Sequence, residues 1–118
     1  MNKKTGQYRV EIREKARGGE GALTFYHLLE KEQLAPYSRL FAKVVMEPGN
    51  SMGYHTHHDE GEAFYILSGV ARITEDGEEV LLYPGDTLFT PAGGSHSVEA
   101  AGGETLEYLA IILSSGIV

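Results

Sequence analysis

The side chains best suited to chemistry in this sequence are the imidazoles of His55 and His57. Residues two apart in an extended strand share a face, so both rings would project to the same side. Glu62 follows a polar run ending in Gly61, where the chain can bend, and His96 comes after a Pro- and Gly-rich turn. Three neutral imidazoles and one carboxylate would suit a first-row divalent metal and leave coordination positions free.

The carboxylate of this set has two candidates. If the strand continued straight beyond His57, strict alternation would place Asp59, rather than Glu62, on the face of the imidazoles. A break in alternation near Gly61 would favour Glu62. His58 would point away from the same face. We therefore expect it to be exposed, or to contact a metal-binding side chain, rather than to bind the metal itself.

The spacing of these residues resembles the two sequence motifs of the cupin family. The first, G(x)5HxH(x)3-4E(x)6G, matches at every defined position from Gly49 to Gly69. The second, G(x)5PxG(x)2H(x)3N, begins at Gly85 and departs only at Ala100, where the family has Asn. The resemblance implies an all-β double-stranded β-helix, or jelly roll, and favours one ligand set: His55, His57, Glu62 and His96.

Composition limits the class of protein further. The chain has 118 residues, 42% of them hydrophobic and 23% charged, which predicts one globular domain over 1–118 with a flexible start at 1–7. No apolar run approaches the roughly 20 residues that span a bilayer, so we expect a cytoplasmic protein with no membrane partner. Without Cys, a metal must be held by His and carboxylates.

The net charge of -7 argues against nucleic acid as a partner. Several basic residues do gather near the start of the chain, and we interpret them as a solvated face. They are Lys3, Lys4, Arg13, Lys15 and Arg17.

Apolar and polar alternation predicts nine or ten short strands separated by turns. The clearest cover 8–13, 22–29, 40–46, 64–67, 70–74, 79–82, 87–90, 97–99 and 106–113. Segment 22–29 could instead form a short helix, 30–38 reads as a polar connector, and 113–118 as a tail or subunit contact. Asp76 and Gly77 indicate a hairpin turn, and Ala42, Val44 and Met46 should form the core face of their strand.

Other side chains allow two interpretations. Five apolar or aromatic residues could line the cavity or belong to the core. They are Met46, Tyr54, Phe64, Ile66 and Phe89. We expect His27, outside both motifs, to be partly buried and bonded to backbone.

Two functions fit these features. The first is an enzyme acting on a small oxygen-rich molecule, such as a carboxylate, sugar or enediol, at one divalent ion of Mn, Fe, Ni, Co or Zn. The second is a non-catalytic module that binds or senses a small molecule. The resemblance also implies a homodimer, with the strand at 8–13 as a candidate for exchange between copies.

Overall fold

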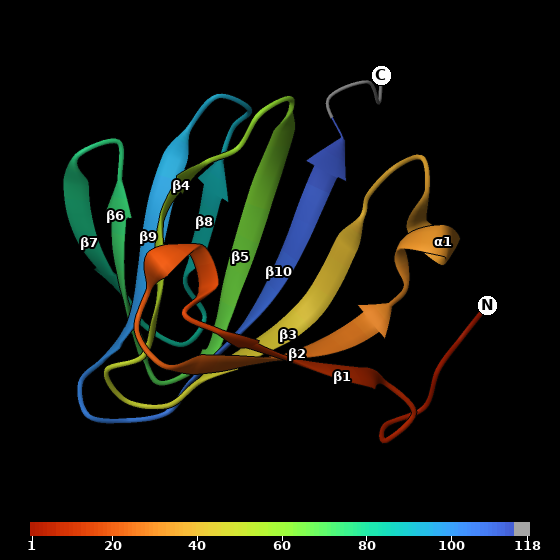
Figure 1. Ribbon diagram of the computed structural model, residues 1–118, viewed down its shortest axis with the longest axis horizontal. Coiled ribbons are helices and arrows are strands. Elements are labelled where there is room, and N and C mark those ends of the chain that lie inside the picture. Colours follow the sequence, from red (N-terminus) through yellow and green to blue (C-terminus); the bar gives the residue numbers. More distant parts are fainter. Residues whose placement is uncertain (115–118) are drawn as a thin grey trace.

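The computed structural model describes residues 1–114, and its regular secondary structure is almost entirely antiparallel strand (Figure 1). Its strands are β1 (Arg9–Glu14), β2 (Ala22–Leu29), β3 (Leu40–Met46), β4 (Ser51–Thr56), β5 (Glu60–Ser68), β6 (Val70–Glu75), β7 (Glu78–Leu82), β8 (Thr87–Thr90), β9 (Ser95–Ala101) and β10 (Leu106–Ser114). Two short helical segments, η1 (Ala16–Gly18) and α1 (Lys31–Leu34), complete the described chain. The all-β prediction is confirmed.

The strands form two sheets. One has six strands in the order β1-β2-β3-β10-β5-β8, and the other has four in the order β4-β9-β6-β7. After β3 the chain passes repeatedly from one sheet to the other; β4 and β5, for example, lie in different sheets (Figure 1). This crossing between sheets is the arrangement of a jelly roll, and it lets the two sheets enclose one core.

Alternation along the strands explains how the core forms. In β3, Ala42, Val44 and Met46 are buried, whereas the residues between them are partly exposed, as predicted. β10 alternates in the same way and pairs with both β3 and β5. The core joins buried side chains of both sheets. They include Leu23, Phe25, Val44, Met46, Phe64, Ile66, Ala71, Ile73, Val98, Leu106 and Tyr108.

Several local predictions can be compared with the structure. Segment 22–29 is a strand, and Asp76 and Gly77 have φ of 48° and 86° at the hairpin between β6 and β7. The segment 30–38, predicted as a polar connector, contains the single turn α1. Of the tail predicted at 113–118, residues 115–118 lie outside the described part. Within that part, no helix is long and apolar enough to cross a membrane.

The motif positions at the strand ends serve the backbone. Gly69 has φ of 78°, and a Cβ there would lie 2.3 Å from the carbonyl oxygen of Thr105. Ala100, where the cupin motif has Asn, is tied by its main chain. Its N–H donates to the carbonyl of Asn50, and its carbonyl accepts from the N–H of Gly49. The strand end is therefore anchored without a side-chain amide.

Candidate metal centre

Four potential metal ligands converge between the two sheets. They are His55, His57, Glu62 and His96, whose donor atoms all lie within 4.8 Å of one another. His55 belongs to β4 and His57 follows that strand directly, while His96 comes from the neighbouring strand β9. Glu62 comes from β5 in the opposite sheet. The group is thus assembled across the core from both layers.

The change of sheet explains why Glu62, and not Asp59, joins the imidazoles. β4 ends at Thr56, and Asp59 adopts a φ of 60° before β5 begins. The break in alternation lies at Asp59, two residues earlier than the predicted position near Gly61. Because β5 then runs in the other sheet, Glu62 points back toward His57. Asp59 itself is exposed.

The donor atoms are spaced like ligands of one ion. The Nε2 atoms of His57 and His96 lie 2.9 and 3.1 Å from the Glu62 Oε1 atom, and 3.0 Å from each other. Two ligands about 2.1 Å from a common ion, at right angles to each other, would be about 3 Å apart. The cluster therefore fits a divalent metal without rearrangement of these three side chains.

Hydrogen bonds to Nδ1, on the side of the ring away from the cluster, fix the orientation of the imidazoles of His55 and His96. The Nδ1 atom of His55 lies 2.7 Å from the carbonyl oxygen of Gly53, so Nδ1 carries the proton and donates. The Nδ1 atom of His96 lies 2.9 Å from the Thr90 hydroxyl, which itself donates to the Glu75 carboxylate at 2.6 Å. In the neutral form of both rings Nε2 is consequently left with its lone pair toward the cluster, as metal binding requires.

The protonation of the cluster also suits a cation. Burial raises the pKa of the Glu62 carboxyl, but the hydrogen bonds and charge that His57 and His96 supply when their rings are protonated outweigh it and bring that pKa down to about 2. Burial lowers the pKa of His55. The hydrogen bond to Gly53 raises this pKa, and the neighbouring imidazoles and Arg17 lower it by smaller amounts. Glu62 is thus ionised at neutral pH, and His55 favours its neutral, metal-binding form.

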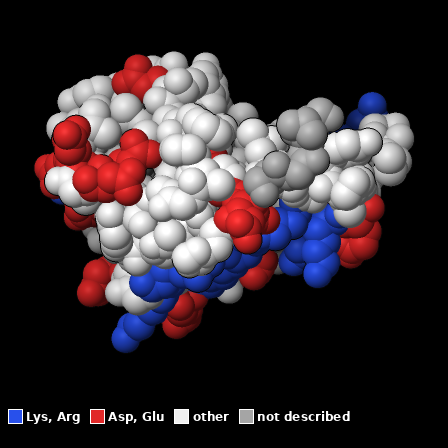
Figure 2. Space-filling model, turned by 90° about the horizontal axis from the view of Figure 1, so that it is seen from above, with Lys and Arg blue, Asp and Glu red and all other residues white. Residues whose placement is uncertain are grey.

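Arginines surround the entrance to this cluster. Besides three of the four candidate ligands, the hollow above it is lined by Phe25, Leu40, Met52, Ile112, Arg13, Arg17 and Arg39. A larger hollow of about 450 Å³ adjoins it and shares Arg13, Arg39 and Leu40. Figure 2 shows a band of basic side chains crossing one face of the molecule, with acidic groups beside it. Arg17 is exposed and Arg13 partly so, as predicted for a solvated face, and both also line this hollow.

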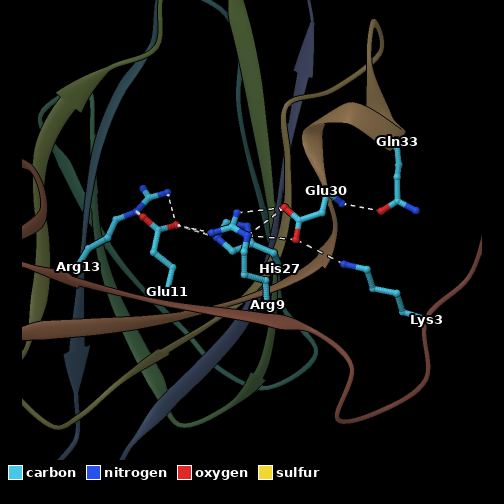
Figure 3. A network of polar contacts seen from close by, with 7 residues as sticks. All are labelled: Lys3, Arg9, Glu11, Arg13, His27, Glu30 and Gln33. Atoms are coloured by element: carbon cyan, nitrogen blue, oxygen red, sulfur yellow. Dashed lines mark hydrogen bonds and ion pairs between the residues drawn. The ribbon is translucent and has the colours of Figure 1, made fainter.

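A network of charged contacts borders the second hollow (Figure 3). One of its members, Arg13, also lines the metal pocket. Arg13 donates to Glu11 at 2.9 Å, and the other oxygen of Glu11 lies 2.7 Å from the Nε2 atom of His27. Arg9 and Lys3 both contact Glu30. His27 is buried as predicted, but its partner is a carboxylate rather than backbone. His58 is exposed.

The cavity residues suggested by the sequence are placed elsewhere. Met46, Phe64 and Ile66 belong to the core, although the Phe64 ring lies against that of His96, with centroids 5.1 Å apart. Tyr54 and Phe89 are exposed. The residues that do line the pocket come largely from β1, η1, β2 and β3, far from the motifs in the chain. Nothing in their local spacing marked them.

Comparisons with known proteins agree with this fold. The family described as "Cupin domain" matches residues 42–112. The oxalate-binding protein of Thermotoga maritima is 43% identical over 97 residues, which are 82% of this chain and 80% of that protein. A crystal structure from the same organism, described as a predicted oxalate decarboxylase, has a TM-score of 0.91 at 38% identity and covers 97% of this chain and 99% of its own.

A further similarity concerns only a segment of a larger protein. A mannose-1-phosphate guanylyltransferase of Klebsiella pneumoniae is 33% identical over 69 residues. These are 58% of this chain but 15% of that enzyme.

Proposed function

This chain belongs to the cupin domain family, and we propose that it binds a small carboxylate anion, with oxalate as the first candidate, at a divalent metal. The proposed metal ligands are His55, His57, Glu62 and His96. One observation carries the proposal: three imidazoles and a single carboxylate meet in a buried cluster whose spacing fits one ion.

The charge of the site favours an anion. A divalent ion and one carboxylate leave one net positive charge, and three arginines line the same hollow. When bound, the metal would supply a Lewis acid for a carboxylate oxygen. Among the chain's own residues, a guanidinium group that lacks a carboxylate partner would then hold the ligand, because its paired N–H donors match carboxylate geometry.

The size of the hollow favours a small ligand. Its volume of about 50 Å³ is well below the roughly 300–1,000 Å³ of pockets that take drug-sized molecules. Among the substrate classes considered from the sequence, a small carboxylate fits better than a sugar. The name of the similar Thermotoga maritima protein supports the same choice.

Turnover of oxalate is the second candidate. The similarity to a structure described as a predicted oxalate decarboxylase favours it, as does a ligand set that leaves octahedral positions uncovered. The reaction would break the C–C bond of oxalate, so that oxalate and one proton give formate and carbon dioxide. Enzymatic formate production would establish this candidate. Binding with no formate would favour the binding module.

The test begins with the protein freed of metal and reloaded with Mn²⁺. Calorimetric titration with oxalate should show binding to the loaded protein and none to the metal-free protein. The same titration of Glu62→Gln, supplied with the same Mn²⁺, should show little binding. Oxalate binding by the metal-free protein at the wild-type affinity would contradict the proposal.

We also propose that two copies pair through the outer face of the six-stranded sheet. This face exposes Val10, Ile12, Tyr65, Leu67, Phe89 and Leu113. Large apolar side chains exposed on one sheet face favour an interface there. Strand β1 pairs with β2 of its own chain here, and exchange of β1 between copies stays a prediction. Sedimentation should give a dimer, and Tyr65→Glu should shift it toward monomer.

A further inference from the structure

The three arginines of the metal pocket differ in their partners. Arg13 donates to Glu11 at 2.9 and 3.3 Å, and its guanidinium lies 4.1 Å above the ring of Phe25. Arg39 donates to both oxygens of Glu60, at 2.8 and 2.9 Å. In the described chain, no ion pair or side-chain hydrogen bond is found for Arg17. Of the three guanidinium groups, that of Arg17 therefore has its N–H donors available to bind a ligand.

The backbone of Arg17 adopts a conformation that L-residues rarely take. Its φ and ψ are 54° and 29°, and Lys15 has a φ of 50°. A left-handed conformation at a residue other than Gly costs about 1–2 kcal/mol. Residues held in such a conformation gather at ligand-binding sites, where the surrounding structure imposes it. The turn η1 therefore places Arg17 at an energetic cost.

Close backbone contacts hold this turn against the strand that carries His55. A Cβ at Gly53 would lie 2.1 Å from the carbonyl oxygen of Arg17, and one at Gly19 would lie 2.2 Å from that of Ser51. Only Gly permits so close an approach of two main chains. The carbonyl of Gly53 also accepts the hydrogen bond that orients His55. One residue thus positions both the turn bearing Arg17 and a candidate metal ligand.

We propose that Arg17 recognises the second carboxylate of a dicarboxylate whose first carboxylate binds at the metal centre. This inference rests on the proposed function and deepens it. A monocarboxylate would satisfy the metal alone, whereas oxalate would also accept hydrogen bonds from the free guanidinium of Arg17. Arg13 and Arg39, each already bonded to a carboxylate, shape the wall of the pocket. Arg17 accordingly sets the preference for two carboxylates over one.

The experiment compares four Mn²⁺-loaded proteins: wild type, Arg17→Gln, Arg17→Lys and Lys15→Gln. Lys15 stands in the same turn and is not among the residues that line the pocket, so its variant removes an equal charge nearby. Calorimetry with oxalate and with acetate gives the affinity for each anion. Bound metal and thermal unfolding are measured for every variant to establish that the site and fold persist.

Arg17→Gln should weaken oxalate binding about 10- to 100-fold, the range for loss of charge-assisted hydrogen bonds. Its acetate affinity and metal content should stay near those of wild type. Arg17→Lys should recover part of the loss, because Lys keeps the charge but not the paired donors. Lys15→Gln should bind oxalate as wild type does.

Two results would overturn the assignment of Arg17 while leaving the proposed function in place. One is oxalate binding by Arg17→Gln within about twofold of wild type, which is too small a loss for a direct hydrogen bond to a charged group. The other is an equal loss of oxalate and acetate affinity, which would show a general effect of charge. If metal-loaded wild type bound neither anion, the proposed function itself would fail.

Discussion

Two imidazole–carboxylate contacts in this molecule look alike but have different surroundings. The His57–Glu62 contact measures 2.9 Å and the His27–Glu11 contact 2.7 Å, and both imidazoles are 6% exposed. Glu11 also accepts hydrogen bonds from Arg13, which neutralises its charge (Figure 3). In the described part of the chain, Glu62 contacts imidazoles and no Lys or Arg.

The difference shows which surroundings of an imidazole–carboxylate pair favour metal binding. A buried carboxylate needs positive charge nearby. At Glu11 a permanent guanidinium supplies that charge. At Glu62 the charge must come from protons on the imidazoles or from a cation among them. The first cluster is therefore the candidate metal centre, and the second is a network of ion pairs and hydrogen bonds.

Exchanging each carboxylate for its amide should separate the two sites most strongly. Glu62→Gln removes the only anionic ligand, and we expect at least a 100-fold loss of Mn²⁺ affinity, since changes outside the ligand set already cost about 10- to 100-fold. The matched variant Glu11→Gln should keep wild-type affinity. Metal analysis after equilibrium dialysis measures both. Equal metal content in the two variants would break the distinction.

A smaller effect on metal affinity is expected from Thr90, which contacts a candidate ligand on the side away from the metal. Thr90→Val keeps the shape of the side chain but removes the hydroxyl between His96 and Glu75. The imidazole of His96 would lose the partner that holds its Nδ1 proton, and metal affinity should fall about 10- to 100-fold. The same dialysis measures the loss. Unchanged affinity would mean that packing alone orients His96.

Acidification should release the metal and leave the second network intact. An imidazole with the reference pKa of about 6.5 is largely protonated at pH 5, so Mn²⁺ affinity should fall at least tenfold between pH 7 and 5. Because the pKa of His55 is lowered, that ring resists protonation further than usual. Glu62, with a pKa of about 2, stays ionised throughout. Affinity unchanged at pH 5 would exclude a site built from three imidazoles.

The smallest effect concerns stability. Hydrogen bonds from Arg13 and His27 outweigh the effect of burial and lower the pKa of Glu11 to about 2. Since this folded-state pKa lies below the ordinary value, the contribution of Glu11 is present above about pH 4.5 and is lost toward pH 2. Glu11 is 35% exposed, so Glu11→Gln should cost less than about 1 kcal/mol of unfolding free energy. Urea unfolding at pH 7 measures it. A much larger loss would indicate that β1 depends on this network.

The sequence predicted much of the fold and the four members of the metal cluster. Alternation located the strands, including β2 and β3 with the bounds that the structure has, because side-chain direction in a strand has a period of two residues. The spacing of His55 and His57 is a local property of the same kind. Family spacing then selected Glu62 and His96. That these four residues bind metal stays a proposal.

Other features depended on how the sheets pack. The choice between Asp59 and Glu62 was open by alternation alone, because it depends on where the chain leaves one sheet for the other. Arg13 and Arg17 lie about forty residues before His55, and no short-range pattern links them to it.

The amino-acid sequence by itself determined the strands, the turns between them and the donor groups, since these follow from backbone periodicity and residue chemistry. Only the tertiary structure decided that η1 rests on β4 and that Arg17 lines the same hollow as His55 and His57. That contact requires two main chains to approach where Gly19 and Gly53 carry no Cβ. Proximity of this kind is a property of the packed molecule.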